Sequence, residues 1–153
     1  MIAIREGGLD DAQVQDLLRL HATGMLANSP AGSCHFLDLS GLQSADVSFW
    51  SAWEGEDLLG MGALKQLDAE HGEVKSMRTV PAHLGKGMGA AMLEHILSVA
   101  RARGLLRLSL ETGTAPAFEP AIRLYTRYGF VPCPAFGDYP KDDPHSRFLT
   151  VAL

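Results

Sequence analysis

The strongest hydrophobic pattern lies in the middle of the chain, where a strand-like segment and a helix-like segment flank a glycine-rich turn. Residues 73–80 carry β-favouring side chains at alternating positions and stop at Pro81, which is typical of a strand. Residues 90–103 instead carry apolar side chains at helical spacing, and Gly104 follows as a left-handed stop. The apolar face of this helix consists of Met92, Leu93, Ile96 and Ala100.

The first third of the chain also alternates between strand and helix patterns. Residues 2–6 have the pattern of a short strand, and Asp10 is expected to cap a helix, with a glutamine three positions later. Residues 28–35 are rich in turn formers, and Asp38 is expected to cap a short helix that ends at Leu42. The longer of these two helices has one apolar stripe, formed by Val14, Leu17, Leu18, His21 and Met25.

Two further strand patterns occupy residues 47–53 and 58–67, and a short polar turn joins them. Together with residues 73–80 they make three strands in succession, whose short connections predict antiparallel pairing. In a doubly wound dinucleotide-binding fold the glycine-rich turn follows the first strand of a parallel sheet. The order of elements therefore excludes that fold.

The last third of the chain adds strands around one more helix. Residues 105–111 have a strand pattern, and residues 117–128 favour a helix with Pro120 in its first turn. A glycine ends this helix, a strand is expected to begin at position 130, and residues 147–153 are expected to form the last strand. Leu106, Leu108 and Leu110 are expected to share one face of the first strand, and Ala121, Leu124, Tyr125 and Tyr128 one stripe of the helix.

Composition and charge narrow the class of protein. A chain of 153 residues with 46% hydrophobic and 20% charged residues is typical of one globular domain, here residues 1–153. The net charge of −5 argues against a nucleic-acid partner, because phosphate backbones require a basic surface, and mildly favours a cationic acceptor. The N-terminus lacks a signal-peptide pattern and no apolar run approaches the ~18 residues of a membrane span, so we expect a cytoplasmic protein without a membrane partner.

The two cysteines do not suggest chemistry of their own. Cys34 and Cys133 lie in neither a Cys-x-x-Cys motif nor a cysteine and histidine cluster of metal-binding spacing. We therefore expect free thiols in a reducing cytoplasm, no metal site and no catalytic role for either cysteine.

Three glycines at alternate positions, Gly85, Gly87 and Gly89, precede the central helix. They leave the backbone without Cβ atoms where a helix presents its first unpaired N–H groups, and Lys86 adds a positive charge, so the turn is suited to a phosphate group. The alternative is that the glycines only allow a tight turn. Neither the phosphate-loop motif of nucleotide hydrolases nor the Gly-x-Gly-x-x-Gly dinucleotide fingerprint matches this spacing.

With its preceding strand and following helix, this turn resembles the acyl-CoA pyrophosphate loop of the GNAT superfamily of N-acetyltransferases. Gly87 and Gly89 match the last two positions of the family pattern Arg/Gln-x-x-Gly-x-Gly/Ala, whereas Leu84 stands where that pattern has Arg or Gln. A second family signature is similar to the run from Ala121 through Leu124 and Tyr125 to Gly129 and Phe130, and residues 29–38 are similar to a small bacterial subgroup.

The resemblance implies an α/β (α+β) fold with a mixed, mostly antiparallel sheet of about six or seven strands and about four helices. It also implies acetyl-CoA as co-substrate, with a backbone N–H near Met77 or Arg78 that polarises the thioester carbonyl. A homodimer is expected by the same resemblance. The residues expected to bind acetyl-CoA are Met77, Arg78, Thr79, Val80, Gly85, Lys86, Gly87, Met88, Gly89, Ala90, Thr112 and Ala121.

The resemblance further implies direct transfer of acetyl to a primary amine of a small molecule. Tyr125 is expected to be the general acid that protonates the thiolate, and Glu111 is the preferred general base. Glu73, His35, His21 or a chain of water molecules remain alternatives for the base. The candidates for the acceptor site are His21, Ser33, His35 and Asp38.

Each of these assignments has a simpler alternative. Tyr125 could only pack its helix, Glu111 and His35 could be surface residues, His21 could be a core residue, and Ser33 and Asp38 could be caps. At the level of function the alternatives are an acyl-CoA-binding sensor without turnover, an enzyme that acetylates a protein amine, and a nucleotide-binding protein.

Overall fold

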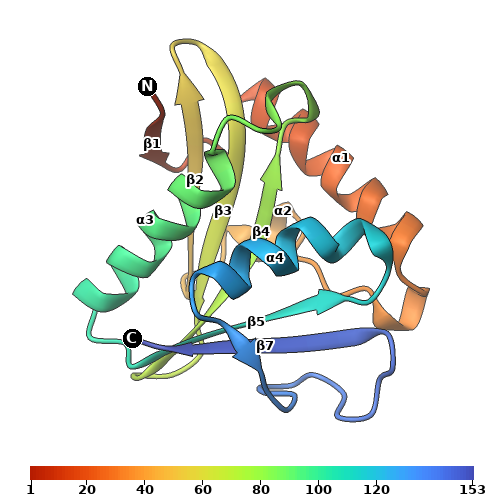
Figure 1. The fold of residues 1–153 in the computed structure, drawn as a ribbon. Helices are drawn as coiled ribbons and strands as arrows, with labels where there is room; N and C mark the ends of the chain where they lie inside the picture. The colour runs from red at the N-terminus through yellow and green to blue at the C-terminus, as the bar shows by residue number, and fades with distance from the viewer.

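The computed structural model describes residues 1–153 and contains one seven-stranded mixed sheet with four helices (Figure 1). The strand order is β1-β2-β3-β4-β5-β7-β6, and every neighbouring pair is antiparallel except β4 and β5. The strands are β1 Ala3–Glu6, β2 Val47–Glu54, β3 Asp57–Gln66, β4 His71–Thr79, β5 Arg107–Gly113, β6 Val131–Pro132 and β7 Ser146–Ala152. The helices are α1 Ala12–Asn28, α2 Leu39–Leu42, α3 Met88–Ala102 and α4 Glu119–Arg127.

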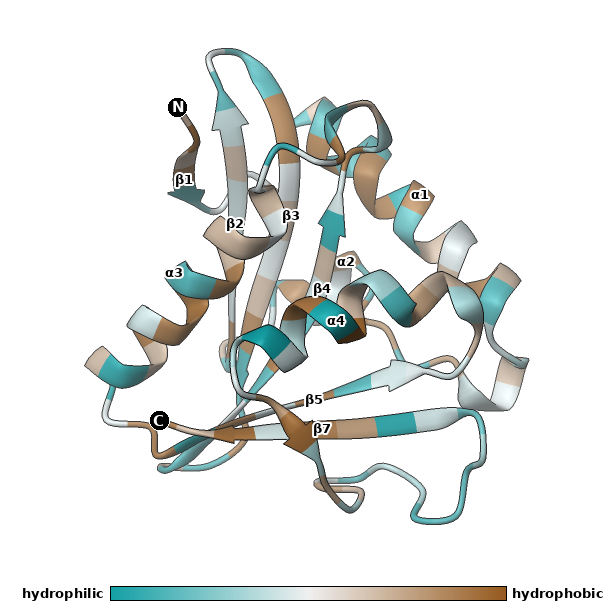
Figure 2. Cartoon of the chain, in the orientation of Figure 1, coloured by the Kyte–Doolittle hydropathy of each residue, from teal (hydrophilic) through white to brown (hydrophobic).

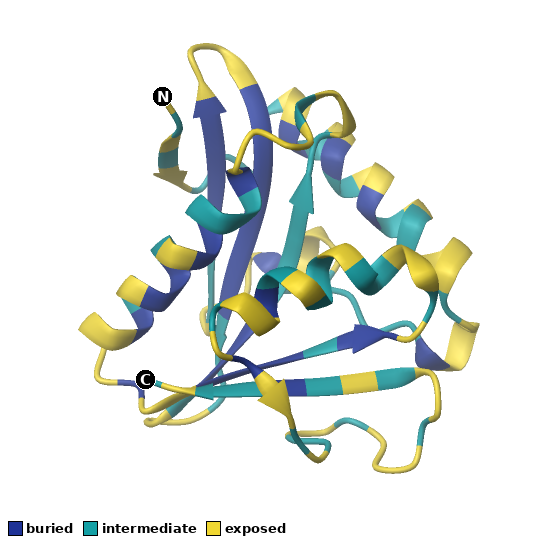
Figure 3. Ribbon diagram, in the orientation of Figure 1, coloured by how far each residue is buried: buried dark blue, intermediate teal, exposed yellow.

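Helices cover both faces of the sheet, which explains why β2 and β3 are buried along most of their length (Figure 3). The central strand β4 instead carries hydrophilic residues (Figure 2). On one face, α3 and α4 pack on the larger core cluster, which includes Trp50, Leu59 and Phe130. On the other face, α1 and α2 pack on a smaller cluster that includes Val14 and Met61. The sheet therefore forms the middle of three layers.

The structure confirms the predicted order of elements and most of the predicted helix faces. Met92, Leu93, Ile96 and Ala100 are fully buried, and Gly104 has the left-handed conformation expected after α3, with φ of 78°. The predicted cap of α1 is wrong by one residue. Asp11, rather than Asp10, accepts hydrogen bonds from the N–H groups of Gln13 (2.8 Å) and Val14 (3.3 Å).

The predicted bounds around β5 and α4 are also corrected. Leu106 lies before β5, is 57% exposed and donates its N–H to the carbonyl of Glu70, so it does not share a buried face with Leu108 and Leu110. Because β5 is covered on both faces, Ser109 is buried as well, and simple alternation does not describe the strand. The first residues of the predicted helix form a separate 3-10 turn, Pro116–Phe118, ahead of α4.

The sheet is irregular where β4 and β5 meet. The parallel strands β4 and β5 pair only over residues 71–73 and 107–109, after which they diverge, as Figure 1 shows. Just beyond this point β4 bulges, because Met61 pairs with Arg78 and Ala63 with Lys75, which leaves two residues of β4 opposite one of β3. One of these two residues, Ser76, has φ of 57°. The facing edges of the diverging strands are therefore free to pair with another extended chain.

Candidate active site

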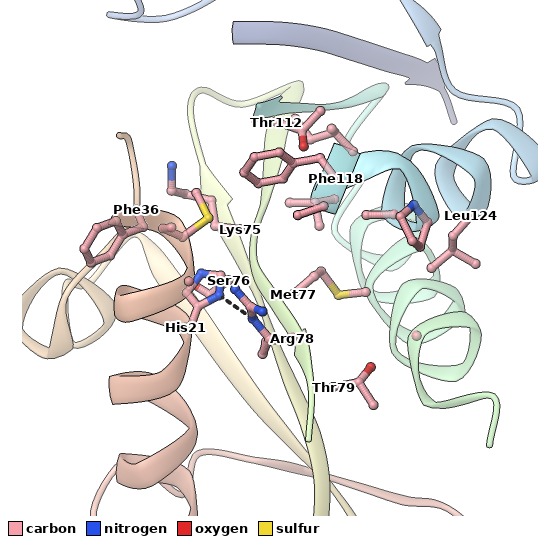
Figure 4. Close-up of a pocket in the computed structure, with 18 of the residues that line it drawn as sticks. His21, Phe36, Lys75, Ser76, Met77, Arg78, Thr79, Thr112, Phe118 and Leu124 are labelled. Atoms are coloured by element: carbon pink, nitrogen blue, oxygen red, sulfur yellow. Dashed lines mark hydrogen bonds between the residues drawn. The ribbon is translucent and has the colours of Figure 1, made fainter. Parts of the chain in front are cut away.

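A cavity of about 480 Å³ lies where β4 and β5 diverge (Figure 4). Its walls come from α1, the segment 35–36, β4, the start of α3, the end of β5 and α4. It therefore connects residues that are separated by a hundred positions in the sequence.

The glycine-rich turn forms one end of this region. Gly87 is the N-cap residue of α3 and has φ of 84°, a backbone conformation that residues other than glycine rarely adopt. None of the N–H groups of residues 85–90 donates a hydrogen bond within the protein, and the regular helix bonds start with Ala91. These donors, at the positive end of a 15-residue helix, fit the pyrophosphate of a CoA ester.

Leu84, at the start of this turn, is 68% exposed and lines the cavity. An apolar side chain supplies no hydrogen bond to a phosphate, so at this point only the backbone N–H groups could hold an anion. The ammonium group of Lys86 lies 2.8 Å from Nδ1 of His83, in an exposed contact.

The β4 residues Met77, Arg78 and Thr79 form the floor of the cavity. Successive side chains of a strand point to opposite sides, and in Figure 4 Met77 points toward α4 whereas Arg78 points toward α1. The backbone of this segment has no strand partner on the β5 side. It can accordingly bind the pantetheine arm of a CoA ester as an added strand.

Tyr125 of α4 reaches the cavity from the other face of the sheet. Its side chain is buried and packs edge-on against Phe130, with ring centroids 5.6 Å apart. Burial raises the pKa of the Tyr125 phenol above its ordinary value, so the phenol is protonated at neutral pH. Tyr128 does not line the cavity and donates its hydroxyl to Glu94 Oε1 at 2.5 Å.

Two carboxylates, Glu111 and Glu73, line the cavity but differ in their surroundings. Burial raises the pKa of Glu111 to about 7, which places its titration at neutral pH. The carboxylate of Glu73 instead accepts from the ammonium of Lys75 at 3.2 Å and from the hydroxyl of Tyr139. Lys75 also donates to the Tyr139 hydroxyl at 2.7 Å, so Glu73 already has its partners.

Two of the four residues predicted for the acceptor site line the cavity. His21 is buried, and its Nδ1 accepts a hydrogen bond from Nε of Arg78 at 3.0 Å. Burial and the neighbouring guanidinium lower the pKa of His21 to about 4, so its imidazole is neutral at neutral pH. His35 packs edge-on against Tyr139, with ring centroids 5.2 Å apart, and its buried Nε2 has no hydrogen-bond partner in the protein.

The other two predicted acceptor residues lie outside the cavity lining. Asp38 is exposed and caps α2 by accepting from the N–H of Gly41 at 2.8 Å. Ser33 is buried in a short 3-10 turn, Ala31–Ser33. Asp38 therefore has the capping role that was its simpler alternative, whereas Ser33 lies within its turn and caps no helix.

Most of the residues predicted for the co-substrate lie together. The cavity lining includes Met77, Arg78, Thr79, Met88, Gly89, Thr112 and Ala121. The remaining ones are not part of the lining but belong to the adjoining turn or its flanks: Val80, Gly85, Lys86, Gly87 and Ala90.

Sequence reasoning missed Gly24, Lys75 and Tyr139. Lys75 stands two positions after Glu73 in a strand, so the two side chains share a face, and this signal was available in the sequence. Tyr139 comes from the β6–β7 connection, 66 positions after Glu73, and no periodic pattern links them.

No three histidine, cysteine or acidic side chains are grouped so that they could hold a metal ion, and no helix has the length and apolarity to cross a membrane. Burial raises the pKa of both Cys34 and Cys133, and neither lines the cavity.

A mixed sheet whose parallel strands diverge beside free N–H groups at a helix N-terminus is typical of a CoA-dependent acyltransferase. Comparison with known proteins identifies the family. Residues 15–130 match the model of the acetyltransferase (GNAT) family, and the chain belongs to this family. It is 50% identical over 153 residues to the uncharacterized N-acetyltransferase YedL of Escherichia coli (strain K12), covering 100% of this chain and 96% of that one. It is 48% identical over 150 residues to the uncharacterized N-acetyltransferase YsnE of Bacillus subtilis (strain 168), covering 98% and 99%.

Solved structures agree with this assignment. A crystal structure from Klebsiella pneumoniae superposes with a TM-score of 0.83 at 29% identity, covering 100% of this chain and 98% of that one. A GNAT acetyltransferase from Elizabethkingia anophelis with acetyl-CoA bound has the same fold, with a TM-score of 0.72 at 19% identity and coverage of 99% and 98%. The protein is an acetyltransferase with acetyl-CoA as its co-substrate, as the sequence predicted.

Proposed function

We propose that this acetyltransferase transfers acetyl from acetyl-CoA directly to the primary amine of a small molecule. One observation carries the proposal: a carboxylate that titrates near neutral pH, Glu111, and a protonated phenol, Tyr125, line one cavity between diverging strands. This is the pair of groups that the reaction needs, because the amine must lose a proton and the departing thiolate must gain one.

The backbone supplies the binding and the polarisation. The free N–H groups of residues 85–90 hold the pyrophosphate, and the open edge of β4 from Met77 to Val80 aligns the pantetheine arm. An N–H group of the bulged segment, at Met77 or Arg78, donates to the thioester carbonyl and stabilises the negative charge that develops on its oxygen.

The side chains then move protons. Glu111 takes a proton from the acceptor ammonium or amine, directly or through water, as the nitrogen forms its bond to the acetyl carbon. Tyr125 donates its proton to the sulfur as the carbon–sulfur bond breaks, so the products are an acetamide and free CoA thiol. Neither cysteine is placed to form an acyl intermediate, which favours direct transfer.

The acceptor side of the cavity is compatible with a small polar molecule. His21 and His35 line it, and the unpaired Nε2 of His35 offers a hydrogen bond that nothing in the protein takes. A volume of about 480 Å³ has to hold the acetyl end of the co-substrate as well, which leaves room for a compact acceptor.

An amine screen tests this proposal. The protein would be incubated with acetyl-CoA and a panel of amino acids, amino acid amides, polyamines, aminoglycosides and peptides with free N-termini. The release of CoA thiol would be measured with a colorimetric thiol reagent. We expect turnover with at least one small amine that yields its N-acetyl product by mass spectrometry. Turnover only with peptides, or none with any amine although acetyl-CoA binds, would contradict it.

A further inference from the structure

Arg78 is a half-buried cation without an acidic partner. Its side chain takes part in none of the ion pairs of the protein, and its one hydrogen bond runs from Nε to His21. The two terminal nitrogens of the guanidinium have no hydrogen-bond partner, although the residue lines the cavity. Burying a charge without a counter-charge costs stability, so an arginine in this setting requires an explanation.

Helix α1 is shaped to hold this guanidinium. His21 and Gly24 lie one helical turn apart, and a Cβ atom on Gly24 would lie 2.8 Å from Nη2 of Arg78. Since Nε of Arg78 is a donor, Nδ1 of His21 must be the acceptor, and the neutral imidazole holds the cation without adding a second charge. A glycine within a helix disfavours the helix, so its presence here is accounted for by the room that Arg78 needs.

The position of Arg78 connects this cation with the acyl site. It directly follows the bulge at Ser76 and Met77, where we place the thioester carbonyl. Its side chain points toward α1, to the side of β4 opposite to Met77 and α4 (Figure 4). Phe36 and His21 lie on this same side of β4 in the close-up, so the guanidinium faces the acceptor part of the cavity and points away from the glycine-rich turn.

We propose that the terminal nitrogens of Arg78 bind a carboxylate of the acceptor, so that the acceptor is an amino acid or a similar amine that carries a carboxylate. A guanidinium matches a carboxylate with two parallel hydrogen bonds. Because Arg78 directly follows the bulge, a carboxylate bound by its side chain would hold the amine of a short acceptor near the acyl site. This inference rests on the proposed function and adds the class of acceptor to it.

Matched pairs of acceptors test the inference. Each of L-phenylalanine, L-leucine and L-methionine would be compared with its amide and its decarboxylated amine, and O-phosphoethanolamine would represent a phosphate-bearing amine. We expect kcat/KM for the acid to exceed that for the amide by about 10- to 100-fold, the range of a charge-assisted hydrogen bond. Equal rates with acid and amide, or a preference for phosphoethanolamine, would overturn the inference.

Two variants locate the effect at Arg78. Arg78→Ala should abolish the difference between acid and amide. Gly24→Ala should raise the KM for the acid about tenfold with an unchanged KM for acetyl-CoA, because the new Cβ displaces the end of a flexible side chain and leaves the fold intact. Thr23→Ala, on the exposed side of the same helix, is the matched control and should change neither constant. A Gly24→Ala protein with the KM values of the wild type would contradict the assignment.

A binding measurement separates this inference from the proposed reaction. N-acetyl-L-phenylalanine and its amide would be titrated calorimetrically into the protein loaded with CoA. Tighter binding of the acid that is lost in Arg78→Ala would support the carboxylate site, whether or not the protein acetylates amines. If the same protein shows no amine turnover, only the proposed reaction is overturned. Equal binding of acid and amide in a protein that acetylates amines would overturn the carboxylate site alone.

Discussion

At the scale of single residues, two carboxylates in one cavity have been given different properties by their neighbours. Glu73 is fixed by Lys75 and Tyr139, whereas burial raises the pKa of Glu111 to about 7, although the charge of Lys75 partly opposes this shift. A general base is most effective when its pKa lies near the working pH. The structure therefore favours Glu111 over Glu73 as the base.

The first prediction concerns Glu111. Glu111→Gln should lower kcat/KM by about 10²-fold or more, the usual contribution of a general base. In the wild type, kcat/KM should rise with pH through about 7, because Glu111 accepts a proton only when it is ionised, and this rise should disappear in the variant. The exposed Glu56→Gln, outside the cavity lining, is the control. If Glu111→Gln keeps the wild-type pH profile and Glu73→Gln loses it, the assignment is wrong.

A second prediction concerns the phenol of α4. Tyr125→Phe should lower kcat by about 10²-fold with little change in the affinity for acetyl-CoA, since the hydroxyl acts on the departing sulfur. Tyr128→Phe removes the hydroxyl of a tyrosine that does not line the cavity and should leave kcat unchanged. Steady-state kinetics and calorimetry measure the two effects, and equal turnover in the wild type and Tyr125→Phe would remove the role.

Sequence reasoning proposed site residues from local patterns and missed cavity residues that depend on distant contacts. The glycine spacing at residues 85–89 and the tyrosine in its helix signature are local, and the structure places both beside the cavity. The guanidinium of Arg78 depends on a helix 54 positions away at Gly24, and Tyr139 on a loop with no periodicity. Such contacts arise only when the chain has folded.

At the scale of elements, the turn before α3 departs from its family at one position. Leu84 replaces the usual Arg or Gln, and it is exposed at the edge of the cavity. The N–H groups of residues 85–90 remain free to bind an anion. The element therefore keeps the backbone donors that we propose for the pyrophosphate and lacks one side-chain donor.

Restoring that contact gives a third prediction. Leu84→Arg should strengthen acetyl-CoA binding by about 3- to 10-fold at low salt, because an exposed arginine can add a charge-assisted hydrogen bond that salt then screens. Ala82→Arg adds the same charge two positions earlier, at an exposed residue outside the cavity, and is the control. Calorimetric titration would contradict the prediction if both variants gained equally or neither gained.

Element order was predictable because each helix and strand carries its own periodicity, while the element ends were less so. Leu106 was placed on a strand face because the predicted strand began at residue 105, whereas β5 begins two residues later, at Arg107. Asp10 and Asp11 are both acceptable caps, and only the course of the chain after Gly8 decides between them. Local sequence therefore predicts that an element exists more reliably than where it starts.

At the scale of the whole molecule, buried groups that support the site also make stability depend on pH. The pKa of His21 is lowered to about 4 in the folded protein from 6.5 in an unfolded chain, because the buried imidazole adjoins Arg78. The unfolded state thus binds the proton more readily between these values. The free energy of unfolding is therefore unaffected by the titration of His21 above pH 6.5, and it decreases as the pH falls from 6.5 to about 4.

A fourth prediction follows for unfolding by denaturant. Between pH 7 and pH 4 the wild type should lose about 3 kcal/mol more stability than His21→Asn, whose amide can accept from Arg78 but does not titrate. Taking the difference between two proteins cancels the opposite contribution of Glu111, which favours the folded state as it becomes protonated. The exposed His145→Asn is the control. A parallel loss of stability in wild type and His21→Asn would contradict the neutral, buried imidazole.

The resemblance to the GNAT superfamily predicted the mixed sheet and the four helices, and the structure confirms both. From local pattern alone, strand pairing was predictable only where connections are short. The succession of β2, β3 and β4 could be read as antiparallel from the sequence, and the structure confirms it. The insertion of β7 between β5 and β6 could not, because it depends on pairing across a long loop. The divergence of β4 from β5 likewise results from packing of the whole sheet, and it is the feature that creates the cavity.

The most direct test of the account is calorimetric titration of acetyl-CoA into the wild type and Gly87→Ala, with ATP as a control ligand. Gly87 lies among the free N–H groups of residues 85–90 and holds a left-handed conformation, with φ of 84°, that alanine disfavours. Gly104→Ala is the matched control, because Gly104 has φ of 78° at the opposite end of α3 and open space around it, as Gly87 does.

The account predicts micromolar binding of acetyl-CoA to the wild type and to Gly104→Ala, about tenfold weaker binding to Gly87→Ala, and no binding of ATP. Equal affinities in all three proteins, or ATP binding as tight as that of acetyl-CoA, would contradict the assignment of the pyrophosphate to the N–H groups of residues 85–90.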